Sequence, residues 1–329
     1  MKIKNSNICI TGIGGFIGKR LAEILKSKGA NVSGLEIDAN HSNKLSTEGF
    51  KVITGSTSNP KDLENLLLNQ DFVIHTAAIV KEGGLLEEFR DVNVRASVNL
   101  AIKAKEMGLK GMIHLSSVMV YGFDYIENIS EDGELKGENN PYCITKIEGE
   151  SELKKIISPE FGIIFIRPGD VYGEGSRPWV ERPLELMKMG LFSLPDGGNG
   201  MMNATYIDNL CEGIILAIEK EAYGEAFNIT DGSTITWKDY FYQLAEAGGY
   251  SKPLSLPIFI AKSLVDVVNL FFSFTGKPSP VSSDGINFIL RKHAVSIDKA
   301  KRVLGYKPLV SLEDGLKRTL DWVKNNKVV

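Results

Sequence analysis

Short β-rich runs alternate with helical patterns through the first half of the chain, and this alternation restricts the fold more than any other feature. The runs lie at 7–11, 32–36, 51–54 and 72–75, with helical segments near 16–28 and from Asp62 onward. A longer helical stretch at about 86–107 leads into a further run at 111–115. Strands separated by helices form right-handed βαβ units and a parallel sheet. We therefore predict an α/β fold built on a doubly wound parallel sheet.

A glycine-rich turn follows the first of these runs. Gly12, Gly15 and Gly18 have the spacing GxxGxxG between a predicted strand and a predicted helix. Glycine permits a tight turn, lets backbone N–H groups approach a pyrophosphate and lets the helix pack close to the strand. Three spaced glycines can also be ordinary turn residues, but the strand before them and the helix after them favour a dinucleotide-binding turn.

The second run ends in an acidic residue, Glu36, eighteen residues after Gly18. A carboxylate at this place can accept hydrogen bonds from both ribose hydroxyls of an adenosine, and it repels a 2′-phosphate. The nearest Lys or Arg downstream is Lys44, so no arginine is placed to bind that phosphate. The sequence therefore predicts NAD as the cofactor and makes NADP the less favoured one.

A tyrosine and a lysine lie four residues apart in the helical segment that opens at Pro141. Tyr142 and Lys146 therefore share one helix face. A phenol with a pKa of about 10 is a poor base at neutral pH, but a neighbouring ammonium and a cationic nicotinamide both favour the phenolate. Taken alone, such a pair is more often a contact on a helix surface.

Further motifs follow one another in order over nearly the whole chain. They are TGIGGFIG at 11–18, DFVIHTAA at 71–78, NVRASVNL at 93–100, HLSSVMVYG at 114–122, PYCITK at 141–146, RPGDVYGEG at 167–175, YIDNL at 206–210 and KRVLGYKP near the C-terminus. With these motifs the chain resembles the extended short-chain dehydrogenase/reductase family, which includes nucleotide-sugar epimerases, dehydratases and 3β-hydroxysteroid dehydrogenases. The segment GEAFNITDGSTITWKDYF at 224–241 and the helix after Leu256-Pro257 look most like the 3β-hydroxysteroid dehydrogenase branch. The resemblance implies a Rossmann-type NAD-binding domain and a smaller, mixed α/β C-terminal substrate lobe.

The resemblance also implies the roles of the site residues. Ser117 would hydrogen-bond the reacting oxygen, Tyr142 would exchange the proton, and Lys146 would bind the nicotinamide ribose and lower the pKa of the tyrosine. The residues expected to bind the cofactor are Gly12, Gly15, Phe16, Ile17, Gly18, Glu36, Ser56, Ala77, Ala78, Tyr142, Lys146 and Pro168.

Three polar residues near these motifs need separate interpretation. Asn93 lies where the family has an asparagine mainly for architecture, and we expect His75 to be a strand-end histidine without a catalytic role. Many relatives have an aspartate after the third strand to bind adenine, whereas this chain has Ser56. Either Ser56 takes that role or the adenine contact is missing, which affects the expected cofactor affinity more than the cofactor's identity.

Composition excludes several other classes of protein. Of 329 residues, 43% are hydrophobic and 24% are charged, which are average values for a folded globular protein. The formal net charge of −3 provides no positive field for nucleic acid, so we expect no such partner. The cysteines form no CxxC pair, so we expect neither a disulfide framework nor a metal site, and we expect a cytoplasmic location.

The second half of the chain carries the signals for the substrate. Sugar-nucleotide epimerases of this family generally have an arginine before the YxDN motif to bind pyrophosphate, whereas this chain has Met201 and Met202. The segment 258–274 is amphipathic, and its charged residues exclude a membrane span. Its apolar face carries Ile260, Leu264, Val267, Phe271 and Phe274, and its polar face carries Lys262, Asp266, Asn269 and Ser273. We expect this helix to pack on its own lobe, with weak association with a membrane surface or a role as a door to the substrate site as the alternatives.

We therefore predict an NAD-dependent oxidoreductase that interconverts a secondary alcohol and a ketone on an apolar or ring-bearing small molecule. The first alternative is a nucleotide-sugar epimerase or dehydratase, in which Arg177 or Arg182 would bind the diphosphate. The second is an NAD-sensing regulator without turnover, against which the presence of Ser117, Tyr142 and Lys146 argues.

The same patterns predict the organisation of the chain. We expect the NAD-binding domain at 1–166, with part of 205–230 added to it. The substrate lobe would then comprise 167–204 and 231–329. By analogy with relatives, the helices 86–107 and 142–157 could join two copies into a homodimer.

Overall fold

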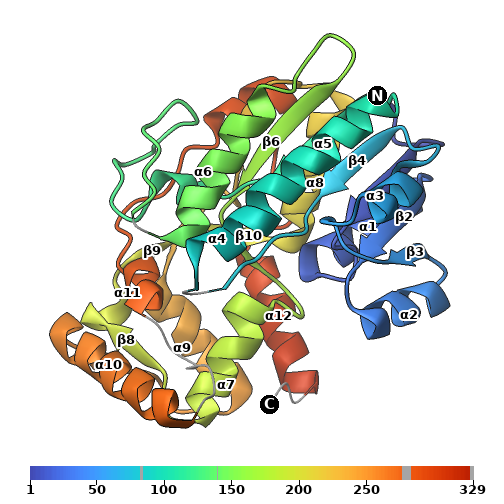
Figure 1. Ribbon diagram of the computed structural model, residues 1–329. Helices are drawn as coiled ribbons and strands as arrows, with labels where there is room; N and C mark the ends of the chain where they lie inside the picture. Colours follow the sequence, from blue (N-terminus) through green and yellow to red (C-terminus); the bar gives the residue numbers. More distant parts are fainter. Residues whose placement is uncertain (82–83, 139, 276–282, 327–329) are drawn as a thin grey trace.

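A seven-stranded parallel sheet forms the centre of the computed structural model, which describes residues 1–81, 84–138, 140–275 and 283–326 (Figure 1). Its strand order is β11-β6-β5-β4-β1-β2-β3. The order reverses at β1, and ligands of doubly wound sheets bind at such a point, beyond the carboxyl ends of the strands. The strands are β1 (Asn7–Thr11), β2 (Asn31–Glu36), β3 (Lys51–Thr54), β4 (Phe72–His75), β5 (Gly111–Leu115), β6 (Gly162–Pro168) and β11 (Ala226–Ile229).

Helices cover both faces of this sheet, as the alternating pattern predicts. Successive side chains of a strand point to opposite faces, so each face has its own core. Ile8 and Ile10 of β1 belong to the core that α1 and α8 complete, whereas Cys9 belongs to the core formed with α3, α5 and α6. These helices are α1 (Phe16–Ser27), α2 (Ala39–Thr47), α3 (Pro60–Leu67), α4 (Leu86–Phe89), α5 (Ala96–Glu106), α6 (Pro141–Lys154) and α8 (Ile207–Glu219). The predicted doubly wound α/β fold is confirmed.

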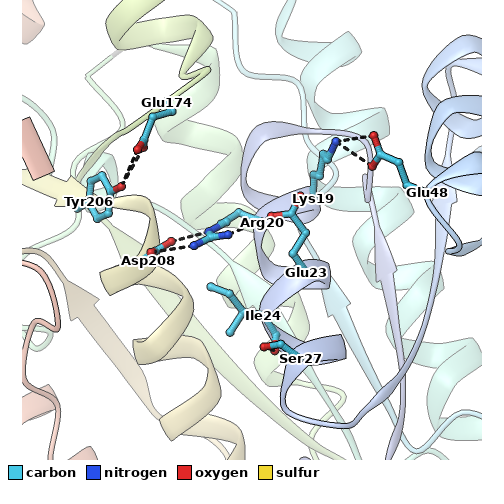
Figure 2. A network of polar contacts seen from close by, with 9 residues as sticks. All are labelled: Lys19, Arg20, Glu23, Ile24, Ser27, Glu48, Glu174, Tyr206 and Asp208. Atoms are coloured by element: carbon cyan, nitrogen blue, oxygen red, sulfur yellow. Dashed lines mark hydrogen bonds and ion pairs between the residues drawn. The ribbon is translucent and has the colours of Figure 1, made fainter. Parts of the chain in front are cut away.

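Helix α1 is joined to the first turn of α8 (Figure 2). Arg20 of α1 donates its Nε to Asp208 Oδ1 at 2.6 Å and its Nη2 to Asp208 Oδ2 at 2.9 Å. Just before α8, the Tyr206 hydroxyl donates to a carboxylate oxygen of Glu174 at 2.9 Å. The YIDNL motif at 206–210 therefore fixes the helix that follows the glycine-rich turn.

The remaining elements form a smaller mixed lobe at one end of the sheet (Figure 1). Its strands pair as β7 (Asp170–Tyr172) with β10 (Ala204–Tyr206), β9 (Met201–Met202) with β12 (Ile235–Thr236), and β8 (Ser193–Pro195) with β13 (Leu254–Leu256). Its helices are α7 (Arg182–Lys188), α9 (Trp237–Gly248), α10 (Ile258–Thr275), α11 (Ser283–Ile289) and α12 (Leu312–Asn326). The boundaries of the two domains stay a prediction.

Helix α10 presents apolar side chains to solvent. Phe259, Val267, Phe271 and Phe274 have exposed fractions between 62% and 81%. The expectation that this helix packs its apolar face on its own lobe is therefore wrong. The lobe instead contacts the side of the helix that carries Ala261, which is only 4% exposed. Within the described ranges, no helix has the length and apolar character that a membrane span requires.

Candidate active site

The predicted catalytic residues lie between the carboxyl end of β5 and the start of α6. Ser117 follows β5 and caps a short 3₁₀ turn (Val118–Tyr121), in which Met119 N donates to Ser117 Oγ at 3.1 Å. Helix α6 begins at Pro141, because Pro suits the first helical position and the Asn140 side chain accepts the Tyr142 N–H at 3.0 Å. The N-terminal half of α6 therefore points the predicted tyrosine and lysine toward the serine.

The structure brings Ser117, Tyr142 and Lys146 together. The Ser117 hydroxyl and the Tyr142 phenol share a hydrogen bond. Lys146 Nζ lies 5.5 Å from the centre of the Tyr142 ring and donates to the Leu115 carbonyl at 2.7 Å. Lys146 is 4% exposed and Ser117 is 6% exposed, so the polar groups of the cluster lie in a shielded environment.

Burial shifts the pKa values of the two titratable members in opposite directions, because it disfavours the charged form of each. Burial raises the pKa of Tyr142 to about 12, and the hydrogen bond with Ser117 offsets only part of this shift. Burial lowers the pKa of Lys146 to about 8. The net shift of the tyrosine pKa is upward because burial disfavours the phenolate, and the role of Lys146 in lowering this pKa stays a prediction.

The glycine-rich turn leaves no room for side chains at two of its positions. Gly12 has φ +70°, and a Cβ there would lie 3.1 Å from backbone atoms of Ala77. A Cβ on Gly18 would lie 2.2 Å from the Gly12 carbonyl oxygen. Gly15 is the N-cap of α1 and provides no side-chain cap, so the first N–H groups of this helix stay available to an anion.

The acidic end of β2 lies against this turn. Glu36 is 7% exposed, its Oε2 accepts the Gly14 N–H at 2.8 Å and its Oε1 accepts the Asp38 N–H at 3.0 Å. These two hydrogen bonds fix the Glu36 carboxylate beside the glycine-rich turn. A carboxylate in this place fits the ribose of NAD and disfavours a 2′-phosphate.

The other residues expected to bind the cofactor border the same edge of the sheet. Phe16 and Ile17 open α1, Ala77 and Ala78 follow β4, and Pro168 ends β6. Together with the glycine-rich turn and Glu36, these positions fit a dinucleotide. Their roles in binding NAD stay predictions.

Ser56 is engaged within its own turn after β3. Its hydroxyl accepts the Ser58 N–H at 3.2 Å, and its N–H donates to Asp62 Oδ2 at 3.0 Å. The sequence analysis missed Asp62, which extends from α3 and places a carboxylate beside this turn. An acidic residue one helical turn into α3 is the signal that could have identified it.

The two other polar residues have the structural contacts that were expected of them. His75 ends β4, is 2% exposed and hydrogen-bonds to Thr11 at 2.7 Å and to Ser97 at 2.8 Å. The Asn93 amide oxygen accepts the Ile79 N–H at 2.8 Å, and its amide nitrogen donates to Thr145 Oγ1 at 3.2 Å. Asn93 therefore joins the loop after β4 to α6.

A buried ion pair next to the cluster was also not predicted from the sequence. Glu150 and Arg167 are 1% and 2% exposed, and Arg167 Nη2 lies 2.6 Å from Glu150 Oε2. The signal was present in the sequence, because Glu150 lies four residues after Lys146 and Arg167 opens the RPGDVYGEG motif. Spacing alone did not show that the two side chains meet.

Fold and site together define an enzyme of the extended short-chain dehydrogenase/reductase type, with a glycine-rich turn and a serine, tyrosine and lysine cluster. The model of the NAD-dependent epimerase/dehydratase family matches residues 8–230, and the chain belongs to this family. This confirms the resemblance inferred from the motifs, the assignment as an enzyme and NAD as the cofactor.

Similar proteins of known activity act on different kinds of substrate. A 4-hydroxy-2-methyl-3-oxo-4-farnesyl-3,4-dihydroquinoline-1-oxide ketoreductase of Stigmatella aurantiaca is 24% identical over 313 residues, which cover 93% of each chain. A 3beta-hydroxysteroid-dehydrogenase/decarboxylase of Arabidopsis thaliana is 25% identical over 95% of this chain and 61% of its own. The crystal structure of a UDP-glucuronic acid 4-epimerase from Bacillus cereus in complex with NAD has a TM-score of 0.77 and 25% identity, covering 98% of this chain and 99% of its own.

Proposed function

We propose that this NAD-dependent enzyme interconverts a secondary alcohol and a ketone on an apolar or ring-bearing substrate. The cluster of Ser117, Tyr142 and Lys146 carries this proposal, with a hydrogen bond between Ser117 and Tyr142 and the Lys146 ammonium 5.5 Å from the centre of the Tyr142 ring. Its members provide a proton donor, a partner for a substrate oxygen and a cation within one shielded site. A regulator that only senses NAD would not require this combination.

Each residue of the cluster has a separate task in the proposed reaction. Ser117 holds the substrate oxygen by a hydrogen bond, and Tyr142 takes the proton from that oxygen or returns it. Lys146, positioned by the Leu115 carbonyl, binds a ribose hydroxyl and keeps a positive charge near the phenol. A bound NAD⁺ supplies a hydride acceptor and a second positive charge that favours the phenolate.

Two arginines of the substrate lobe are already paired, which supports an apolar substrate. Arg177 is exposed and forms ion pairs with Glu181 and Glu185. Arg291 is fully buried, and its Nη2 lies 2.6 Å from Asp170 Oδ2. Because these two arginines are already paired with carboxylates, they are less available to a diphosphate, which would lose its hydration and gain little from them in return.

Aromatic rings of the substrate lobe, together with Phe123, also favour an apolar substrate. Phe123 follows the 3₁₀ turn that Ser117 caps, and its ring lies 5.3 Å from that of Phe288. Phe288 in turn lies 6.0 Å from Trp179. Of the two methionines singled out in the sequence, Met202 is fully buried in the core, so only Met201 remains partly exposed. The ketoreductase relative, whose name describes a farnesylated quinoline oxide, is consistent with this substrate class.

A nucleotide-sugar epimerase is the second candidate, favoured by the likeness to UDP-glucuronic acid 4-epimerase over almost the whole chain. The deciding experiment offers the protein UDP- and GDP-sugars, hydroxysteroids and aliphatic 3-hydroxy compounds together with NAD. Net NADH formation is followed for all of them, and epimer composition for the sugars. We expect NADH from a hydrophobic alcohol. Epimerisation of a sugar without net NADH, and no oxidation of any hydrophobic alcohol, would replace the proposed function by the second candidate.

A further inference from the structure

Helix α6 carries a third functional group on the face that holds the catalytic pair. Tyr142, Lys146 and Glu150 follow one another at intervals of four residues, so their side chains lie on successive turns of one face. Glu150 is 1% exposed, and Lys146 is 4% exposed. A carboxylate is rarely buried this deeply without partners, so its surroundings need an explanation.

The carboxylate of Glu150 is held by two neighbouring strands. Arg167 of β6 donates its Nε to Oε1 at 2.8 Å and its Nη2 to Oε2 at 2.6 Å. The Ser116 hydroxyl, at the end of β5, donates to Oε1 at 2.6 Å. Arg167 is itself fixed, because its Nη1 donates to the Tyr121 hydroxyl at 2.8 Å and to the Glu131 carbonyl at 3.0 Å. Glu150 therefore keeps one position relative to β5, β6 and α6.

Glu150 is also kept ionised. Burial alone would raise its pKa, but the hydrogen bonds and the charge of Arg167, helped by Ser116, hold the pKa below its ordinary value. A negative charge is therefore present one helical turn from Lys146 across the neutral pH range. Its attraction for the ammonium acts in a shielded environment, because both side chains are almost fully buried.

In the part of the chain that the structure describes, the other titratable groups around Lys146 and Glu150 supply no negative charge. His75 on β4 and His114 on β5 are buried, and burial followed by the repulsion from Lys146 lowers their pKa values, so both rings are neutral. Tyr142 on α6 is a neutral phenol at neutral pH because burial raises its pKa. Arg167 on β6 and Lys154 on α6 are cations, and both pair with Glu150, at 2.6 and 4.0 Å. Glu150 is thus the acidic group that offsets the burial of the ammonium.

We propose that Glu150, clamped by Arg167 and Ser116, is a positioning residue that keeps Lys146 protonated at neutral pH. This role rests on the proposed function, because it matters to the reaction only if a charged Lys146 serves Tyr142 and the ribose. It concerns the protein's own charges, however, and can be measured without NAD or substrate.

The test follows the protonation of Lys146 directly. Protein labelled with ¹³C at the lysine ε-carbons is titrated by NMR, and the Lys146 signal is assigned by its loss in Lys146→Arg. In the wild type we expect a midpoint of about 8. In Glu150→Gln, which keeps the shape of the side chain and removes its charge, we expect the midpoint to fall by at least about half a pH unit.

Glu148→Gln is the matched control. Glu148 lies on the same helix, is 33% exposed and pairs with Arg90 at 2.7 Å. We expect its removal to leave the Lys146 midpoint within about 0.2 units of the wild type, because water screens its charge. An unchanged midpoint in folded Glu150→Gln, or an equal fall in Glu148→Gln, would overturn the role of Glu150.

A second variant covers the case in which Glu150→Gln does not fold. Glu150→Asp keeps the charge that pairs with Arg167 but withdraws it by one methylene, so we expect a smaller fall of the midpoint in the same direction. A midpoint identical to that of the wild type contradicts the proposal. If the titration behaves as expected while the enzyme oxidises no alcohol, the proposed function fails and the role of Glu150 stands.

Discussion

Tyr142 shows how strongly one side chain depends on its surroundings. With a pKa of about 12, the phenol stays protonated at neutral pH. Catalysis near neutral pH therefore needs a further positive charge beside the phenol, which favours the phenolate. The type and spacing of Tyr142 and Lys146 could be predicted from the sequence. The pKa of Tyr142 could not be predicted, because the burial and the charges that set it come from residues far apart in the chain.

Replacement of Tyr142 by Phe removes the proton carrier and keeps the ring. We expect turnover to fall at least about a hundredfold, with little change in NAD affinity, because loss of a general acid or base acts on the chemical step. Steady-state kinetics and calorimetry measure the two effects. Tyr242→Phe, a change outside the cluster, serves as the control. Retention of more than about a tenth of the activity would show that another group moves the proton.

We expect Glu36 to determine the preference for NAD over NADP. We expect calorimetry to show tighter binding of NAD than of NADP, because the 2′-phosphate would face a fixed carboxylate. Glu36→Gln keeps an oxygen that can accept the Gly14 N–H but removes the charge. The difference in affinity between NAD and NADP should therefore become smaller. Glu48→Gln, which removes a carboxylate paired with Lys19, should leave it unchanged. Equal binding of both nucleotides by the wild type contradicts this assignment.

At the scale of helices and strands, the parallel sheet could be predicted best. Buried strands form continuous apolar runs, and those at 7–11 and 72–75 match β1 and β4. The run at 51–54 matches β3, which lies at the edge of the sheet and is less buried. Helix α2 was missed, because only Ser42 and Leu45 are buried and its sequence has almost no apolar period. The stretch 86–107 is helical to Glu106, but Arg90–Arg95 within it form π-helical turns that no periodicity indicates.

The turn between β1 and α1 depends on close packing of two glycines. We expect Gly18→Ala to lower the free energy of unfolding by more than about 2 kcal/mol. Its Cβ would lie 2.2 Å from the Gly12 carbonyl oxygen, and a backbone atom cannot move away as easily as a side chain. Gly15→Ala, whose Cβ would lie 3.2 Å from the same oxygen, should be markedly milder. Denaturant unfolding compares them. Equal losses would mean that the turn can relax.

The outer face of α10 allows a contrasting prediction. Phe271→Lys places a charge where 64% of the side chain is exposed, so we expect a stability change within about 0.5 kcal/mol and less aggregation. Ala261→Lys, on the same helix but 4% exposed, should destabilise the protein strongly. Thermal unfolding distinguishes the two. Strong destabilisation by Phe271→Lys would show that this face is packed within the molecule.

At the scale of the whole molecule, contacts between distant segments decide what the sequence could not show. The ion pair of Arg20 with Asp208 joins residues 188 positions apart. The pair of Glu150 with Arg167 links a helix to a strand of the sheet. Each motif could be located in the sequence, but only the assembled sheet determines which motifs meet.

Two buried histidines make the stability of the whole fold depend on pH. His75 has its pKa lowered to about 3, first by burial and then by Lys146, and the pKa of His114 is lowered well below its ordinary value for the same reasons. An unfolded histidine titrates at about 6.5, so between these values the unfolded state binds more protons. The stability from the neutral rings is therefore complete above about pH 6.5 and is lost as the pH falls toward 3.

His114→Leu tests this dependence. Neither ring nitrogen of His114 has a hydrogen-bond partner among the described residues, so an apolar replacement leaves no new polar atom unpaired. We expect stability at pH 7.5 to change little and the loss of stability between pH 6.5 and 4.5 to become clearly smaller. Denaturant unfolding at several pH values measures it, with the exposed His41→Leu as the control that should keep the wild-type slope. The same acid slope in His114→Leu and in the wild type would mean that this ring does not stay neutral in the folded protein.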